Sequence, residues 1–165
     1  MDEIRYGVIG SGMMGIEHML IVHLCEGARV VAIADPNEGS QGWARLTAKD
    51  KGFPLDVFAD HRAMIERGGI DAVVVATPDH THFHPASAAM ELGKHLYLEK
   101  PMAHNVWECR KLTELAARNN LATQLGMQRH VKDNMHRVTE LIRAGAIGDV
   151  TEVHSWVSSE RGMFP

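Results

Sequence analysis

The chain has 165 residues, of which 45% are hydrophobic and 23% charged, and its formal net charge is -4. This length accommodates one ordinary α/β domain and a short appendage. The acidic balance disfavours a nucleic-acid-binding protein, which normally presents a basic face. The first residues do not form a secretory signal pattern, and no apolar run approaches the ~18 residues that span a bilayer. We therefore expect a cytoplasmic protein without nucleic-acid or membrane partners.

Apolar segments alternate with helical patterns along the first 127 residues. Strands are predicted at residues 5–9, 30–34, 55–59, 72–77, 95–98 and 121–127, and helices at 15–25, 38–49, 61–67, 82–92 and 105–119. The segment Ala72 to Thr77 is apolar and rich in β-branched residues, as expected of a strand buried on both faces of a parallel sheet. Alternation of this kind predicts an α/β fold with a doubly wound parallel sheet of the Rossmann type over residues 1–127.

Residues 128–165 depart from this alternation. Apolar residues recur there with helical spacing: Met135, Val138, Leu141 and Ile142. Gly145 and Gly148 would end that helix, and residues 150–158 alternate as a strand of a different sheet. We predict a linking helix and the first strand of a second α/β domain that is cut short. Because a lone strand leaves its backbone N–H and C=O groups unpaired, we also predict a homo-oligomer in which this strand finds a partner.

A glycine-rich loop follows the first predicted strand and opens the first helix. It is Gly10-Ser11-Gly12-Met13-Met14-Gly15, a match to G-x-G-x-x-G in the context that the motif requires. Gly10 would permit the tight turn, Gly12 would let a pyrophosphate approach the backbone, and Gly15 would allow close packing of helix on strand. The helix N-terminus then offers N–H donors to the phosphates. The loop predicts a dinucleotide site.

Asp35 follows the second predicted strand, twenty residues after Gly15. A carboxylate at this place accepts hydrogen bonds from the adenosine ribose hydroxyls and repels a 2′-phosphate. Pro36 and Asn37 come next, with no Arg or Lys beside them to bind that phosphate. We therefore predict NAD as the cofactor, with NADP disfavoured. The alternative is a glycine turn and a solvated aspartate without a ligand.

Three histidines alternate in the segment Asp79-His80-Thr81-His82-Phe83-His84. On a strand they would share one face and could hold a metal ion. However, Pro78 and Pro85 bracket the segment, which favours a loop entering a helix, where alternate residues diverge. The segment also follows the carboxyl end of a buried strand, where doubly wound folds bind ligands. We therefore expect polar residues beside a ligand, and no metal site.

Glu99, Lys100 and Pro101 directly follow the fifth predicted strand. A lysine at this end of the sheet faces the same crevice as a dinucleotide. Its ammonium group can hydrogen-bond an alcohol oxygen and stabilise the developing alkoxide as hydride leaves. Glu99 could hold Lys100 in place. The alternative is a surface lysine beside a turn proline.

These motifs together resemble the Gfo/Idh/MocA family, named for glucose–fructose oxidoreductase, inositol dehydrogenase and a rhizopine-catabolism protein. The resemblance covers the glycine loop, Ala76-Thr77-Pro78-Asp79 with His82, Gly93-Lys94-His95 leading to Glu99-Lys100-Pro101, Gln128-Arg129, and residues 141–150. The stretch from Thr77 to Pro101 is more specific than the glycine loop.

The resemblance implies an NAD(P)-dependent oxidoreductase that acts on a sugar, polyol or related diol. It implies that Lys100 is catalytic, that the Lys100–Pro101 peptide bond is cis, and that Glu99 and Lys100 adjoin the cofactor. Thr77, Pro78 and His82 would line the nicotinamide side, and Met13 and Met14 the pyrophosphate loop. Family members continue well beyond residue 165, into a larger domain that supplies the general base and most of the substrate pocket.

Two other functions remain open from the residues. The first is a dinucleotide-binding module or sensor without activity of its own. The second is a metal-dependent hydrolase built on the histidine segment.

Overall fold

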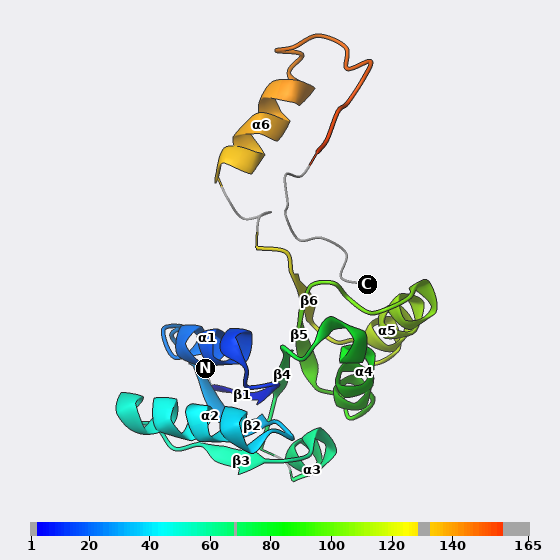
Figure 1. Cartoon of the computed structure of the whole chain (residues 1–165). Helices are drawn as coiled ribbons and strands as arrows, with labels where there is room; N and C mark the ends of the chain where they lie inside the picture. Colours follow the sequence, from blue (N-terminus) through cyan, green and yellow to red (C-terminus); the bar gives the residue numbers. More distant parts are fainter. Residues whose placement is uncertain (1–2, 68, 129–132, 157–165) are drawn as a thin grey trace, which may run out of the picture. The chain divides into compact units, whose positions relative to one another are not determined.

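Figure 1 shows the computed structural model of the chain, which describes residues 3–67, 69–128 and 133–156. The chain divides into two compact units, Met1–Gly126 and Met127–Pro165. Across the described residues, no helix is long and apolar enough to cross a membrane. The candidate site lies in the first unit.

The first unit alternates strands and helices from end to end. Its elements in chain order are β1 (Ile4–Ile9), α1 (Met13–Val22), β2 (Ala28–Ala34), α2 (Glu38–Lys51), β3 (Asp56–Phe58), α3 (His61–Glu66), β4 (Ala72–Val75), the 3₁₀-helix η1 (Asp79–Thr81), α4 (Phe83–Glu91), β5 (His95–Glu99), α5 (Val106–Arg118) and β6 (Thr123–Gly126). The six strands form one parallel sheet in the order β3-β2-β1-β4-β5-β6. This order confirms the Rossmann-type α/β fold, in which the strand order reverses between β1 and β4.

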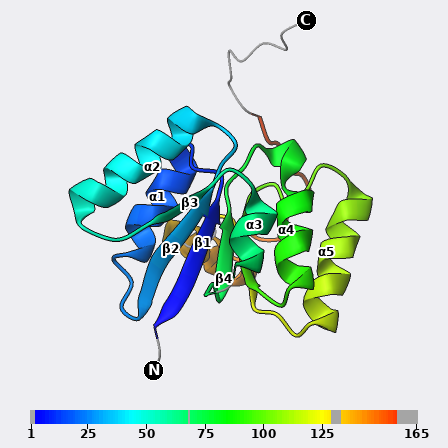
Figure 2. The same cartoon turned by 90° about the horizontal axis from the view of Figure 1, so that it is seen from below.

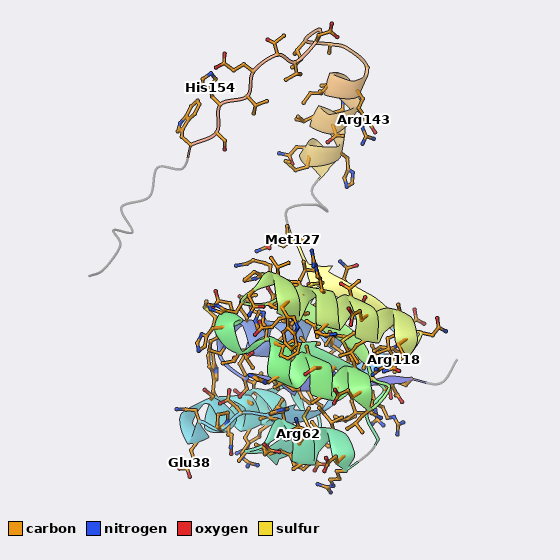
Figure 3. The ribbon with its side chains drawn as sticks, turned by 90° about the vertical axis from the view of Figure 1, so that its right-hand side faces the viewer. Glu38, Arg62, Arg118, Met127, Arg143 and His154 are labelled. Carbon is orange, nitrogen blue, oxygen red and sulfur yellow. The ribbon has the colours of Figure 1, made fainter. Side chains whose placement is uncertain are left out.

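Helices cover both faces of the sheet: α1 and α2 lie on one side, and α3, α4 and α5 on the other (Figure 2). Each side has its own apolar core. Ile16 and Met19 of α1 and Ala44 of α2 pack on one face, and Leu112 of α5 is among the residues packed on the other. The residues of β4 are buried throughout, because helices lie on both faces of this central strand. Charged side chains project outward from the helices, as Figure 3 shows for Glu38, Arg62 and Arg118.

Local signals in the sequence set most helix ends. The Asp60 side chain accepts a hydrogen bond from Ala63 N at 2.9 Å, as expected of an N-cap. Gly93 follows α4 with φ +71°, the left-handed conformation predicted for a glycine after a helix. Helix α1 begins at Met13, two residues before the predicted start, so the glycine loop itself forms its first turn.

The second unit contains helix α6 (Asp133–Arg143), which Gly145 follows at φ +76°. Residues 150–156 pair with no other strand among the described residues, and residues 157–158 lie outside the described part of the chain, so the strand at 150–158 stays a prediction. Alternating apolar residues make a strand only where another strand accepts and donates backbone hydrogen bonds, and no described segment does so for residues 150–156. The homo-oligomer, in which a second copy would supply that partner, likewise stays a prediction.

Arg5 and Asp71 join the amino ends of β1 and β4. Arg5 donates from its backbone N and Nε to Asp71 Oδ2, at 2.9 and 3.0 Å, and from a terminal guanidinium nitrogen to Oδ1 at 2.9 Å. These hydrogen bonds lower the pKa of Asp71 from 3.8 to about 2. Because the folded-state pKa is depressed, the pair stabilises the fold fully above about pH 4 and ceases to do so as the pH falls towards 2.

We therefore expect Asp71→Asn to lower the free energy of unfolding at pH 7 by only about 0.5–1 kcal/mol, because both side chains are more than a third exposed. The difference between the two proteins should vanish as the pH falls from 4 to 2. Urea denaturation across that range measures it. A difference that stays constant down to pH 2 would show that the ionised carboxylate contributes nothing.

Candidate functional site

A cleft of about 750 Å³ opens at the carboxyl ends of β1, β2 and β4, on the switch point of the sheet. Doubly wound folds bind their ligands at this place. Six of the predicted cofactor residues line it: Gly12, Met13, Met14, Asp35, Thr77 and Pro78. The cleft therefore brings together the glycine loop, the acidic residue after β2 and the turn after β4, which lie far apart in the sequence.

A Cβ at each of the three glycines of the loop would meet different surroundings. Gly10 has φ +87°, and a Cβ there would lie 2.7 Å from Ala76 O. A Cβ on Gly15 would lie 1.9 Å from Gly10 O, so helix and loop are in direct contact at that point. A Cβ on Gly12 meets nothing within 4 Å, because Gly12 borders the open cleft. Gly10 and Gly15 thus shape the loop, and Gly12 leaves room for a ligand.

The N-terminus of α1 is left open towards an anion. Its first intrahelical hydrogen bond runs from Ile16 N to Gly12 O at 3.0 Å, and no side chain caps the helix. The N–H groups of the residues before Ile16 therefore have no intrahelical acceptor, and the helix dipole adds positive potential. Together with the empty space at Gly12, this arrangement fits a pyrophosphate.

Asp35 accepts hydrogen bonds from the glycine loop and also borders the cleft. Its Oδ2 accepts hydrogen bonds from Ser11 N at 2.7 Å and Ser11 Oγ at 3.3 Å, and its Oδ1 accepts one from Asn37 N at 2.8 Å. The carboxylate is thus held rigidly, 8% exposed, at the edge of the cleft. Among the described residues that line the cleft there is no lysine or arginine to bind a ribose 2′-phosphate. The described lining of the cleft thus offers a carboxylate and no cation at the end of β2.

The histidine segment does not form a metal site. Because the chain enters a 3₁₀-helix at Asp79–Thr81, successive residues rotate about its axis instead of alternating. His80 and His84 are exposed, whereas His82 is buried. Among the described residues, no group of three His, Cys, Asp or Glu side chains could hold a metal ion. The metal-hydrolase alternative therefore loses its geometric basis.

His82 does not line the cleft, contrary to the expectation that it contacts the cofactor. Its Nδ1 lies 2.7 Å from Pro101 O and its Nε2 lies 2.9 Å from Thr77 O. Both partners are carbonyl oxygens, so each contact is a hydrogen bond when the facing nitrogen carries a proton. His82 therefore connects the turn after β4 to the turn after β5.

The Glu99-Lys100-Pro101 turn also differs from its prediction. Glu99 does not hold Lys100: its Oε1 lies 2.8 Å from His18 Nε2, and both side chains are largely buried. Lys100 is exposed and is not among the residues that line the cleft, because β5 lies one strand further from the switch point than β4. The Lys100–Pro101 peptide bond is cis, as the resemblance implies.

Some residues of this region carry no signal in the sequence. His18 lies three positions beyond the last glycine of the loop. Its contact with Glu99, which the sequence does not show, explains the histidine on the inner face of α1. His61 lines the cleft, and no motif marks it; Thr81 and His84, which also line the cleft, belong to the histidine segment that was expected to lie beside a ligand. Burial lowers the pKa of His61, which favours its neutral form.

Comparison with known proteins agrees with this geometry. The sequence pattern of the family described as "Oxidoreductase family, NAD-binding Rossmann fold" matches residues 4–127. The chain belongs to the Gfo/Idh/MocA oxidoreductase family. Inositol 2-dehydrogenase 1 of Saccharopolyspora erythraea is 37% identical over 153 residues, a match that covers 92% of this chain and 44% of that enzyme. The 2,7-anhydro-N-acetylneuraminate hydratase of Mediterraneibacter gnavus is 32% identical over 158 residues, which cover 94% of this chain and 40% of the relative.

The fold also recurs in solved Gfo/Idh/MocA structures. Scyllo-inositol dehydrogenase of Lactobacillus casei, determined with bound NAD(H) and scyllo-inositol, matches with a TM-score of 0.79 and 28% identity. That match covers 91% of this chain and 44% of the enzyme. The chain thus spans less than half the length of these relatives, and the part it matches is the NAD-binding Rossmann domain.

Proposed function

We propose that this chain is the cofactor-binding part of an NAD-dependent dehydrogenase that oxidises a hydroxyl-bearing carbon of a polyol, sugar or related diol. The observation that carries the proposal is the cleft in which the space at Gly12, the open end of α1 and the Asp35 carboxylate meet. Family membership and the names of the inositol dehydrogenase relatives support the reaction and the substrate class.

In this proposal NAD lies along the cleft. The N–H groups of Met13 and Met14 and the space at Gly12 would take the pyrophosphate, and Asp35 would accept hydrogen bonds from the adenosine ribose. Thr77 and Pro78, on the opposite wall of the cleft, would adjoin the nicotinamide half. When bound, the cofactor supplies the hydride acceptor for the reaction, and the protein supplies position and charge.

Lys100 is the residue of this chain that we propose as catalytic. It stands directly after β5, at the same edge of the sheet as the cleft, and its side chain is exposed, where a substrate can reach it. An ammonium group that donates a hydrogen bond to the substrate oxygen would stabilise the alkoxide that develops as hydride leaves. The general base and most of the substrate pocket are proposed to come from a second domain.

A dinucleotide-binding module without activity is the second candidate. It is favoured by the position of Lys100, which is not on the cleft wall. Incubation of a protein that contains this chain and the proposed second domain with NAD and, separately, myo-inositol, scyllo-inositol and glucose, followed by NADH absorbance, distinguishes the two. NADH formation supports the dehydrogenase; tight NAD binding without NADH formation from any polyol or sugar supports the module.

A further inference from the structure

Both neighbours of Lys100 are in contact with histidines, one partly buried and one buried. On one side, Glu99 Oε1 accepts a hydrogen bond from His18 Nε2 at 2.8 Å. On the other side, the carbonyl oxygen of Pro101 lies 2.7 Å from His82 Nδ1. Lys100 itself is exposed, so the position of its ammonium group depends on what fixes the backbone on either side.

The two histidines come from the two walls of the dinucleotide cleft. His18 lies on α1, the helix that begins in the glycine loop, and its side chain is 13% exposed. His82 lies between η1 and α4, shortly after Thr77 and Pro78, and is 1% exposed. Its second nitrogen, Nε2, faces Thr77 O at 2.9 Å. The Lys100 turn is therefore joined to both structures that border the cleft.

The contact between His18 and Glu99 is closely enclosed. The Tyr97 and His18 rings pack in a T-shaped arrangement, with their centroids 5.0 Å apart. On the other side, a Cβ on Gly126 would lie only 3.0 Å from Glu99 Oε1. A carboxylate enclosed in this way needs its hydrogen-bond donor, because an unpartnered buried charge is costly. Loss of the His18 contact would therefore make Glu99 turn towards water and move the chain at Lys100.

We propose that His18 and His82 are positioning residues that fix Lys100 relative to the dinucleotide cleft. The catalytic role of Lys100 rests on the proposed function, but the contacts of His18 with Glu99 and of His82 with Pro101 do not. The competing explanation is that both histidines only fill space beneath the turn.

The nitrogen atoms that make the contacts distinguish the two explanations. His18 uses Nε2, which the amide nitrogen of glutamine can replace and that of the shorter asparagine cannot reach. His82 holds Pro101 through Nδ1, which asparagine can replace, whereas glutamine can replace only the Nε2 contact with Thr77. Positioning thus predicts opposite preferences, glutamine at residue 18 and asparagine at residue 82. Filling of space predicts glutamine at both, since it is closer to histidine in size.

The test is ¹⁵N relaxation of the whole chain without ligand, for the wild type, His18→Gln, His18→Asn, His82→Asn and His82→Gln. We expect backbone order parameters of about 0.85 at Lys100 and Met102 in the wild type, His18→Gln and His82→Asn. In His18→Asn and His82→Gln they should fall below about 0.6, while Val74 of β4 stays rigid as the internal control.

The proposal would be overturned by equal backbone order parameters at Lys100 and Met102 in all four variants. It would also be overturned if the glutamine variant had the higher order parameters at both residue 18 and residue 82. Failure of His18→Gln or His82→Asn to fold would overturn it too, because these variants keep the contact in question. Calorimetric titration of the same proteins with NAD tests the proposed function separately. A wild type that binds no NAD would refute the proposed function, while the order parameters still decide the role of the two histidines.

Discussion

Gly12→Val is expected to weaken NAD binding by about a hundredfold, equivalent to ~2.7 kcal/mol, and to leave the stability of the fold unchanged. A Cβ on Gly12 meets no atom within 4 Å, and its backbone angles, φ −69° and ψ −166°, suit any L-residue. The valine side chain therefore enters the cleft without straining the protein, in the space that we assign to the pyrophosphate. Calorimetric titration with NAD and thermal unfolding measure the two quantities.

The matched control is Gly15→Ala in the same loop. Its Cβ would lie 1.9 Å from Gly10 O, so loop and helix must move apart. We expect a loss of about 3 kcal/mol of stability, which lowers the melting temperature by roughly 10 °C. If Gly12→Val bound NAD as tightly as the wild type does, the pyrophosphate would not lie at this loop. If Gly15→Ala melted at the wild-type temperature, the close contact between Gly15 and Gly10 would not require a glycine at residue 15.

In a protein that contains this chain together with the proposed second domain, Lys100→Met is expected to lower kcat with NAD and the best polyol substrate by about 10²–10³, the typical cost of losing a donor to a developing oxyanion. The affinity for NAD should change less than about threefold, because Lys100 does not line the dinucleotide cleft. Steady-state kinetics and a separate NAD titration provide this comparison. Lys51→Met, at the exposed end of α2, is the control and should leave both values unchanged.

A variant with full kcat would remove Lys100 from the chemistry. A variant with unchanged kcat and much weaker NAD binding would instead make Lys100 a cofactor contact. The two parameters therefore separate the catalytic role that the resemblance implies from a binding role.

The fold could be predicted from sequence because its signals are local. The apolar segment Ala72–Val75 marks the central strand, and the glycine loop with Asp35 marks the order in which strand, turn and helix must follow. The strand predicted at residues 150–158 has no partner for residues 150–156 among the described residues. Alternation shows that a segment suits a sheet, but pairing depends on a partner that the pattern does not specify.

The site was harder to predict where it depends on contacts between distant segments. The glycine loop, Asp35, Thr77 and Pro78 meet at the cleft, because parallel strands end at one edge of the sheet. The partners of Glu99 and His82 are side-chain choices that the sequence does not reveal. His18 lies 81 residues from Glu99. His82 turns inward because of a 3₁₀-helix too short to show a periodic pattern.

The central claim is that the cleft at Gly12 and Asp35 binds NAD in preference to NADP. Calorimetric titration of the chain with each cofactor tests it most directly, with Asp35→Ala as the comparison. We expect NAD to bind at least about tenfold more tightly than NADP, a difference of ~1.4 kcal/mol, and this preference to disappear in Asp35→Ala. Equal binding of the two cofactors by the wild type, or binding of neither, would contradict the claim.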